Sequence, residues 1–214
     1  MRQGCVLSPI LFNLYTELIF RQFEDSKGTN IGGYDISNLR YVDDTVLVSD
    51  TEEGLQRLVT EASIESGKAG LGMNVKKTKT MVISKFPETA NTDIKINNET
   101  LEQVNMFKYL GQTITPDGKN EQEINIKIAT AKNRFQQLYK VLTSKKISIK
   151  LRHRILVCYI FSVILYGCET WTLTKTLTEK LEACEMWFSS GVWAKLAGKT
   201  NQAVPTKQNL KDPC

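Results

Sequence analysis

The residues best suited to chemistry are two adjacent aspartates, Asp43 and Asp44, which lie in the middle of the run LRYVDDTVLVS. The residues on both sides are β-branched, aromatic and aliphatic types typical of half-buried strands, so the pair is predicted to lie at the turn of a hairpin. Aspartate is common in turns, and taken alone the pair is best interpreted as a polar turn. Two neighbouring carboxylates on a rigid hairpin are also the hard oxygen ligands that magnesium-dependent phosphate chemistry requires.

A helix is predicted before this hairpin, beginning near Ser8, and its apolar residues recur at helical spacing. One broad face of this helix is therefore expected to be buried. Ahead of it stand Arg2, Gln3 and Gly4, a cation, an amide and a small residue beside a helix N-terminus, which is a place suited to phosphate. The apolar residues of the helix are Ile10, Leu11, Leu14, Tyr15, Leu18, Ile19 and Phe23.

Beyond the hairpin, residues 50–53 provide a cap and an acidic first turn for a second amphipathic helix. Short strands are predicted at 80–84, 94–97 and 107–109, and the last of them enters a tight hairpin that contains Gly111. This order predicts an α+β fold, an antiparallel sheet with helices on one face. On residue type alone, the basic segment around Lys77 favours an exposed edge over a catalytic role.

From Glu121 onward the pattern becomes helical, and the apolar run 155–166, too short to cross a bilayer, is predicted to be a buried helix. Residues 127–154 contain nine Lys or Arg and no Asp or Glu. One-sided charge of this length, interleaved with Phe135 and Tyr139, favours a surface that follows a phosphate backbone, because a merely solvated helix usually mixes charges of both signs. The nine residues are Lys127, Lys132, Arg134, Lys140, Lys145, Lys146, Lys150, Arg152 and Arg154.

The composition narrows the function classes. The formal net charge of +5 over 214 residues favours a polyanionic partner. The single histidine argues against a nucleophilic triad, and five scattered cysteines without a C-x-x-C pair indicate a reducing compartment. No signal peptide is recognised, so the expected location is intracellular, in the nucleus or the cytoplasm, with no membrane partner.

Taken in order, the motifs RQGCVLSPILFNLY, YVDD, GLGMNVKKTKTM, FKYLG and VILYGCETWTLT resemble the second half of a LINE-type (non-LTR retrotransposon) reverse transcriptase. The resemblance implies a partial polymerase palm at 1–118, a helical thumb or connection region at 119–188, and a disordered or divergent tail at 189–214. It also implies an RNA-directed DNA polymerase that uses an RNA template, a DNA primer and dNTPs with two Mg²⁺ ions.

The resemblance assigns roles to individual residues. Asp43 would be a direct ligand of the Mg²⁺ ions, Asp44 a supporting carboxylate, and Lys77 a proton donor to the leaving group. The nine basic residues would hold the RNA–DNA duplex through its backbone. The incoming nucleotide would be bound by Arg2, Gln3, Gly4 and Tyr41. The primer grip would be Phe107, Lys108, Tyr109, Leu110 and Gly111.

The sequence also departs from the family. The resemblance leads us to expect that the first catalytic carboxylate of the family, on a strand before the RQG motif, is missing, together with the fingers and the C-terminal Cys/His cluster, and Val6 stands where proline is usual. We therefore expect a truncated copy that polymerises negligibly alone and that would pair with the missing N-terminal half. A non-catalytic nucleic-acid-binding remnant and an unfolded pseudogene product are the alternatives.

Overall fold

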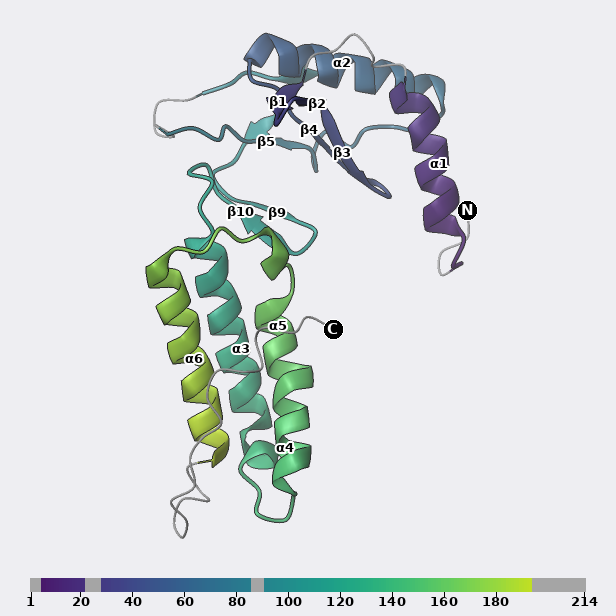
Figure 1. Ribbon diagram of the computed structural model, residues 1–214. Coiled ribbons are helices and arrows are strands. Elements are labelled where there is room, and N and C mark those ends of the chain that lie inside the picture. Colours follow the sequence, from purple (N-terminus) through teal and green to yellow (C-terminus); the bar gives the residue numbers. More distant parts are fainter. Residues whose placement is uncertain (1–4, 22–27, 86–90, 194–214) are drawn as a thin grey trace. The chain divides into compact units, whose positions relative to one another are not determined.

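The computed structural model describes residues 5–21, 28–85 and 91–193, and its chain divides into two compact units, Met1–Phe107 and Lys108–Cys214 (Figure 1). The palm boundary predicted after residue 118 stays a prediction, and the division of the chain falls inside strand β9 (Phe107–Tyr109). The reason is that the tip of this hairpin bonds to the helices that follow it, through Gln112 and Lys127.

Helix α1 (Ser8–Phe20) begins where it was predicted, although Leu7 rather than Ser8 occupies the cap position. The prediction of a broad buried face is wrong. Within α1 only Thr16 and Ile19 are buried, because α2 (Glu52–Lys68) contacts one side of the helix and leaves the apolar side open. Phe23 lies outside the described residues. The side chains of Ile10, Leu11, Leu14 and Leu18 are each more than half exposed.

The strands of the described residues form five separate two-stranded pairs instead of the predicted single antiparallel sheet. Strands of two to four residues make few ladder bonds, and a shared helix supplies the core in place of a continuous sheet. The strand predicted at 80–84 is limited to Lys79–Thr80. The pairs are β1 (Thr29–Ile31) with β2 (Tyr34–Ile36), β3 (Asn38–Tyr41) with β4 (Asp44–Leu47), the parallel β5 (Lys79–Thr80) with β8 (Glu102–Gln103), β6 (Lys95–Ile96) with β7 (Glu99–Thr100), and β9 with β10 (Gln112–Ile114).

Helix α2 provides that core for the first unit. Its start is as predicted, with the Thr51 hydroxyl accepting a hydrogen bond from the backbone N–H of Gly54 at 3.1 Å. Its buried Val59 packs with Ile94, Ile96 and Leu101. The hairpin that carries the aspartate pair rests on this core through β4, which contacts α2.

Three helical segments lie side by side in the second unit: α3 (Glu121–Leu142), α4 with α5 (Ile149–Leu156 and Ser162–Leu165), and α6 (Lys175–Trp193) (Figure 1). Phe188, fully buried, is the centre of the core, with its ring 5.3 Å from Phe135 and 6.3 Å from Phe161. Helix α6 extends to Trp193, so the first five residues of the predicted disordered or divergent tail, 189–193, are helical, and residues 194–214 lie outside the described residues.

The apolar run 155–166 is helical, but it is not buried as a whole. A π-helical turn at Val157–Phe161 joins α4 to α5, and Leu156, Ile160 and Ile164 form a buried stripe. Tyr159 and Leu165 lie outside this stripe and are exposed. The helical segment Ile149–Thr170 is long and apolar enough to cross a membrane by length and composition, with a mean hydropathy of 1.4 and 22% of that window buried.

Candidate active site and nucleic-acid interface

The aspartate pair lies at the tip of a two-residue hairpin, as predicted. Tyr41 in β3 pairs with Asp44 in β4, so Val42 and Asp43 form the loop. Both carboxylates are exposed, as is Tyr41. Val42 has a φ of +54°, a conformation that is strongly unfavourable for a β-branched residue and that persists only where the surroundings impose it.

Helix α1 holds this strained turn. The side-chain oxygen of Asn13 accepts a hydrogen bond from the backbone N–H of Val42 at 3.1 Å. One helical turn later, the carboxylate of Glu17 pairs with the guanidinium of Arg40 in β3, which also lies 4.9 Å from the ring of Phe20. Asn13 and Glu17 were not predicted as site residues. The available signal was their i, i+4 spacing, which puts two polar side chains on one side of a mostly apolar helix.

The pairing of Glu17 has an electrostatic consequence. A hydrogen bond from Arg21, at 3.1 Å, and a second from Arg40 lower the pKa of the Glu17 carboxyl below its ordinary value. The ion pair between Glu17 and Arg40 therefore links α1 to the hairpin most strongly when Glu17 is ionised.

Lys77, another predicted site residue of the first unit, lies in a turn outside the aspartate hairpin. Lys77 is exposed, and its backbone N–H bonds to both oxygens of Asn74, 3.0 Å to the carbonyl and 3.2 Å to the side chain. The motif residue Asn74 thus shapes the turn that presents Lys77. Arg2, Gln3 and Gly4 lie outside the described residues.

The donor set at the hairpin suits a hard cation but is small. Asp43 and Asp44 supply carboxylate oxygens, the ligand type that Mg²⁺ prefers. Among residues 5–21, 28–85 and 91–193, no group of three or more His, Cys, Asp or Glu side chains lies close enough together to hold a metal ion.

The predicted primer-grip residues, Phe107 to Gly111, form β9 and the loop of the β9–β10 hairpin, and the tip of this hairpin belongs to the second unit. Leu110 and Gly111 form its two-residue loop, with φ of +48° and +80°. Two successive positive φ values are typical of a type I′ hairpin turn. Lys108 is exposed, and Phe107 and Tyr109 are half-buried.

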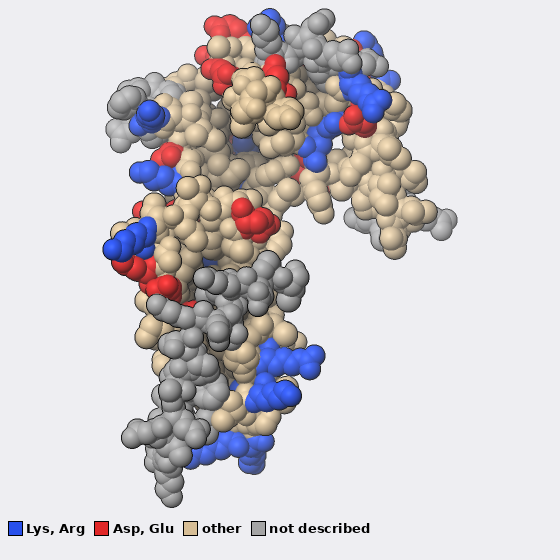
Figure 2. Space-filling model, in the orientation of Figure 1, with Lys and Arg blue, Asp and Glu red and all other residues tan. Residues whose placement is uncertain are grey.

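The acid-free region, residues 127–154, begins inside α3 and continues through the following loop into α4. Figure 2 shows Lys and Arg gathering toward the α3–α4 loop end of the helical unit, while acidic side chains lie toward its other end. Nine residues were predicted to contact the backbone of a nucleic acid. The prediction does not fit Arg152, because this residue is 3% exposed and its guanidinium donates to the carbonyl of Val192 at 3.5 Å. Lys127 is also turned inward. The seven exposed residues are Lys132, Arg134, Lys140, Lys145, Lys146, Lys150 and Arg154.

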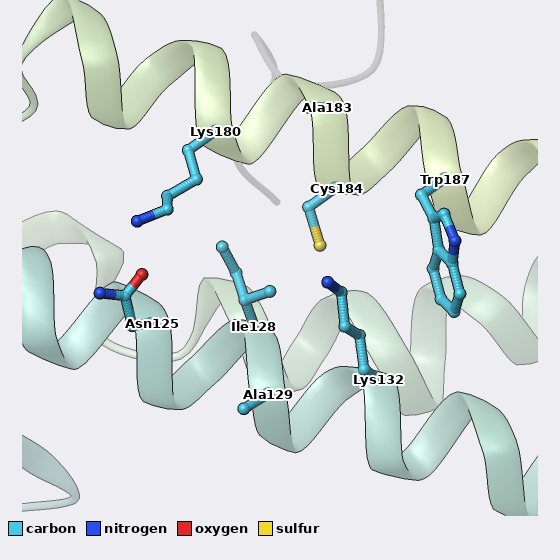
Figure 3. Close-up of a pocket in the computed structure, with 8 residues that line it drawn as sticks. All are labelled: Asn125, Ile128, Ala129, Lys132, Lys180, Ala183, Cys184 and Trp187. Carbon is cyan, nitrogen blue, oxygen red and sulfur yellow. The ribbon is translucent and has the colours of Figure 1, made fainter.

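One of these seven, Lys132, lines a groove of about 460 Å³ between α3 and α6 (Figure 3). Its ammonium lies 5.7 Å from the centre of the Trp187 ring. On the floor of the groove is Cys184, and burial raises the pKa of its thiol. Lys180 enters from the other end, 3.7 Å from Glu121. Sequence reasoning did not identify this groove.

Comparison with known proteins places these observations in a family. A family model described as reverse transcriptase (RNA-dependent DNA polymerase) matches residues 1–114, more than half of the chain. The match includes the aspartate hairpin, the Lys77 turn and the β9–β10 hairpin.

Similar curated proteins come from mobile elements. The chain is 29% identical over 135 residues to the retrovirus-related Pol polyprotein from type-1 retrotransposable element R2 of Nasonia vitripennis, covering 59% of this chain and 13% of that protein. It is 29% identical over 127 residues to the polyprotein from type-2 retrotransposable element R2DM of Drosophila melanogaster, covering 56% and 12%. A transposon-derived protein of Caenorhabditis elegans is 26% identical over 156 residues, covering 71% and 54%. The chain therefore spans only a small part of the length of the two Pol polyproteins.

Proposed function

The chain belongs to the reverse transcriptase family, as its motifs predicted, and we propose that it is part of the RNA-directed DNA polymerase of a non-LTR retrotransposon. The observation that carries the proposal is the hairpin at Asp43 and Asp44. Two exposed carboxylates stand at a strained turn, inside the region that the family model matches.

In this proposal, Asp43 and Asp44 hold Mg²⁺, with Asp43 as the direct ligand. Bound Mg²⁺ would activate the primer 3′ hydroxyl and neutralise charge on the phosphates during nucleotidyl transfer. The chain itself contributes a turn fixed by Asn13 and Arg40, so the carboxylates need little reorganisation to bind the cation. Two carboxylates bind Mg²⁺ weakly by themselves, because it usually needs further oxygen ligands.

The other motifs that resemble the family take supporting roles. Tyr41 is exposed beside the carboxylates and can contact the end of the primer or the incoming nucleotide. Lys77, held out by the Asn74 turn, can donate a proton to the leaving pyrophosphate. The first unit would then be a palm fragment and the second a thumb, with the β9–β10 hairpin as the primer grip.

A second candidate function is nucleic-acid binding without catalysis. Seven exposed basic residues of the helical unit support it, because they remain whether or not the metal site is complete. RNA–DNA duplex, a substrate of this family, is the partner to test first.

The two candidates are separated by a pair of titrations on the full chain. Mn²⁺, a paramagnetic substitute for Mg²⁺, should selectively broaden the amide signals of Asp43 and Asp44. Asp43→Asn should abolish that broadening, whereas Asp50→Asn, an exposed aspartate outside the hairpin, should not. Absence of selective broadening in the wild-type chain would contradict the metal-binding proposal.

Binding of an RNA–DNA duplex is then measured at several salt concentrations. Each phosphate contact adds about 0.9 to the slope of log affinity against log salt, so a backbone-tracking surface gives a steep slope. Binding with Mn²⁺ broadening supports the polymerase assignment, and binding without it supports the second candidate. If the chain shows neither Mn²⁺ broadening nor duplex binding, both candidate functions are contradicted. Primer extension by this chain alone should be negligible, because the described residues offer no third carboxylate at the site.

A further inference from the structure

We propose that Tyr166, Gln112 and Lys127 are positioning residues that lock the turn of the β9–β10 hairpin onto the helical unit, so that the hairpin tip meets a nucleic-acid strand as part of that unit. The inference rests on the proposed function, because it takes the hairpin to be an element that contacts the primer. None of the three was predicted to act in this way.

The turn needs support from outside. A hairpin with strands of three residues is barely stable by itself, and Leu110 is a bulky residue at φ +48°. Both loop carbonyls receive that support from side chains of the helical unit. The hydroxyl of Tyr166 donates to the Leu110 carbonyl at 3.1 Å, and the ammonium of Lys127 donates to the Gly111 carbonyl at 3.3 Å.

The second strand is fixed from the same side. The amide of Gln112 donates to the Tyr166 carbonyl at 2.8 Å, and its oxygen accepts from the indole N–H of Trp171 at 3.5 Å. Tyr166 is thus joined to the hairpin through both its side chain and its backbone. The hairpin and Tyr166 are packed too closely to admit a side chain at either neighbouring glycine. A Cβ on Gly167 would lie 1.4 Å from the Gln112 side-chain nitrogen, and one on Gly111 would lie 2.9 Å from the Tyr166 ring.

Lys127 is occupied within the protein. Its ammonium lies 3.3 Å from a carboxylate oxygen of Glu123 and 4.7 Å from the centre of the Tyr166 ring, and its side chain is 12% exposed. Glu123, 2% exposed, accepts the backbone N–H of Thr113 at 2.8 Å. The lysine charge is therefore balanced by a buried carboxylate, which makes it a clamp for the turn rather than a phosphate contact.

We call the contacts of Tyr166, Gln112 and Lys127 with the hairpin the clamp. The first test concerns this clamp alone, in the chain without nucleic acid. Tyr166→Phe removes one hydroxyl, and Tyr159→Phe is its matched control, because both tyrosines are 57% exposed and lie in the same helical segment. We expect amide hydrogen exchange at Gly111 and Gln112 to be about 2- to 10-fold faster in Tyr166→Phe and unchanged in the control. Equal exchange in the two variants would overturn the proposal.

The second test separates positioning from phosphate contact. Lys127→Met should weaken binding of an RNA–DNA duplex several-fold and reduce duplex-induced amide protection at residues 108–112, while the salt slope stays unchanged. The exposed Lys140→Met should lower the slope by about 0.9 and leave that protection intact. Lys127→Arg keeps the charge and a donor, and should restore protection at least in part.

Circular dichroism melts establish that each variant is folded before its binding is interpreted. A lower salt slope for Lys127→Met, equal to that of Lys140→Met, would make Lys127 a phosphate contact and overturn its positioning role. If the wild-type chain bound no duplex, the proposed function would fail instead, and the exchange measurement on the free chain would still decide whether the clamp exists.

Discussion

Asn13 accepts a hydrogen bond from the backbone N–H of Val42 at 3.1 Å, and Val42 is the residue at which the chain turns just before Asp43. A side chain on a helix thus stabilises a backbone conformation that valine disfavours. The ion pair between Glu17 and Arg40 ties the next turn of the same helix to the same hairpin. Helix α1 therefore determines the position of the carboxylates, although most of its apolar side chains are exposed.

Replacing Asn13 with alanine should loosen the hairpin. Loss of the hydrogen bond costs about 0.5 to 1.5 kcal/mol, partly offset because alanine is the better helix former by about 0.6 kcal/mol. Asn133→Ala, at an exposed position of α3, measures that propensity gain alone. The check is chemical denaturation of both variants together with amide exchange at Val42. If Asn13→Ala is as stable as Asn133→Ala and Val42 exchange is unchanged, Asn13 does not support the turn.

Glycine usually destabilises a protein when it replaces valine in a hairpin, but Val42→Gly should not. At φ +54° valine carries about 1 to 3 kcal/mol of strain that glycine does not, so we expect the variant to be as stable as the wild type or up to about 1 kcal/mol more stable. Val46→Gly, in the middle of β4 where strand geometry is ordinary, should destabilise by about 1 kcal/mol. Equal destabilisation of the two variants in denaturant melts would show that Val42 is not strained.

The local features could be predicted from the sequence because short-range physics determines them. The carboxylates at the turn, the helix cap within residues 50–53, and the strand at 107–109 all follow from residue type and spacing over a few positions. The order of the motifs was sufficient to recognise the family.

The features that could not be predicted depend on what packs against each element. Helical periodicity shows that α1 has an apolar face, but not whether another element covers it, and Leu14 is 60% exposed. Charge counting placed Arg152 with its basic neighbours, although its spacing from Leu156 and Ile160 puts it on the buried stripe. The bonds that join Tyr166 to Leu110 and Gln112, on either side of the β9–β10 turn, connect residues more than fifty positions apart, which single-sequence patterns do not reveal.

The contrast between Arg152 and Arg154 can be measured directly. Arg152 is 3% exposed with its Nε atom unpaired, so Arg152→Met should change stability by less than about 1 kcal/mol or increase it, and should leave the salt slope of duplex binding unchanged. Arg154→Met, on the exposed side of α4, should weaken binding and lower the slope by about 0.9. Titration of an RNA–DNA duplex across a range of salt concentrations checks both, and an equal loss of slope for both variants would contradict the assignment of Arg152 to the core.

The link between α1 and the hairpin should weaken in acid. Hydrogen bonds from Arg21 and Arg40 lower the pKa of Glu17, so its folded state favours the ionised carboxylate. The stabilisation is therefore fully present above the ordinary glutamate pKa of about 4.3 and is lost as the pH falls through the lowered pKa. Glu17→Gln should be less stable than the wild type at neutral pH, and the difference should shrink below about pH 4 and also at high salt, because the pair is partly exposed. Urea melts across this pH range, with Glu99→Gln in β7 as the control for general loss of negative charge, provide the measurement. A difference between the wild type and Glu17→Gln that stayed constant down to pH 3 would mean that the ionised Glu17 does not hold the hairpin.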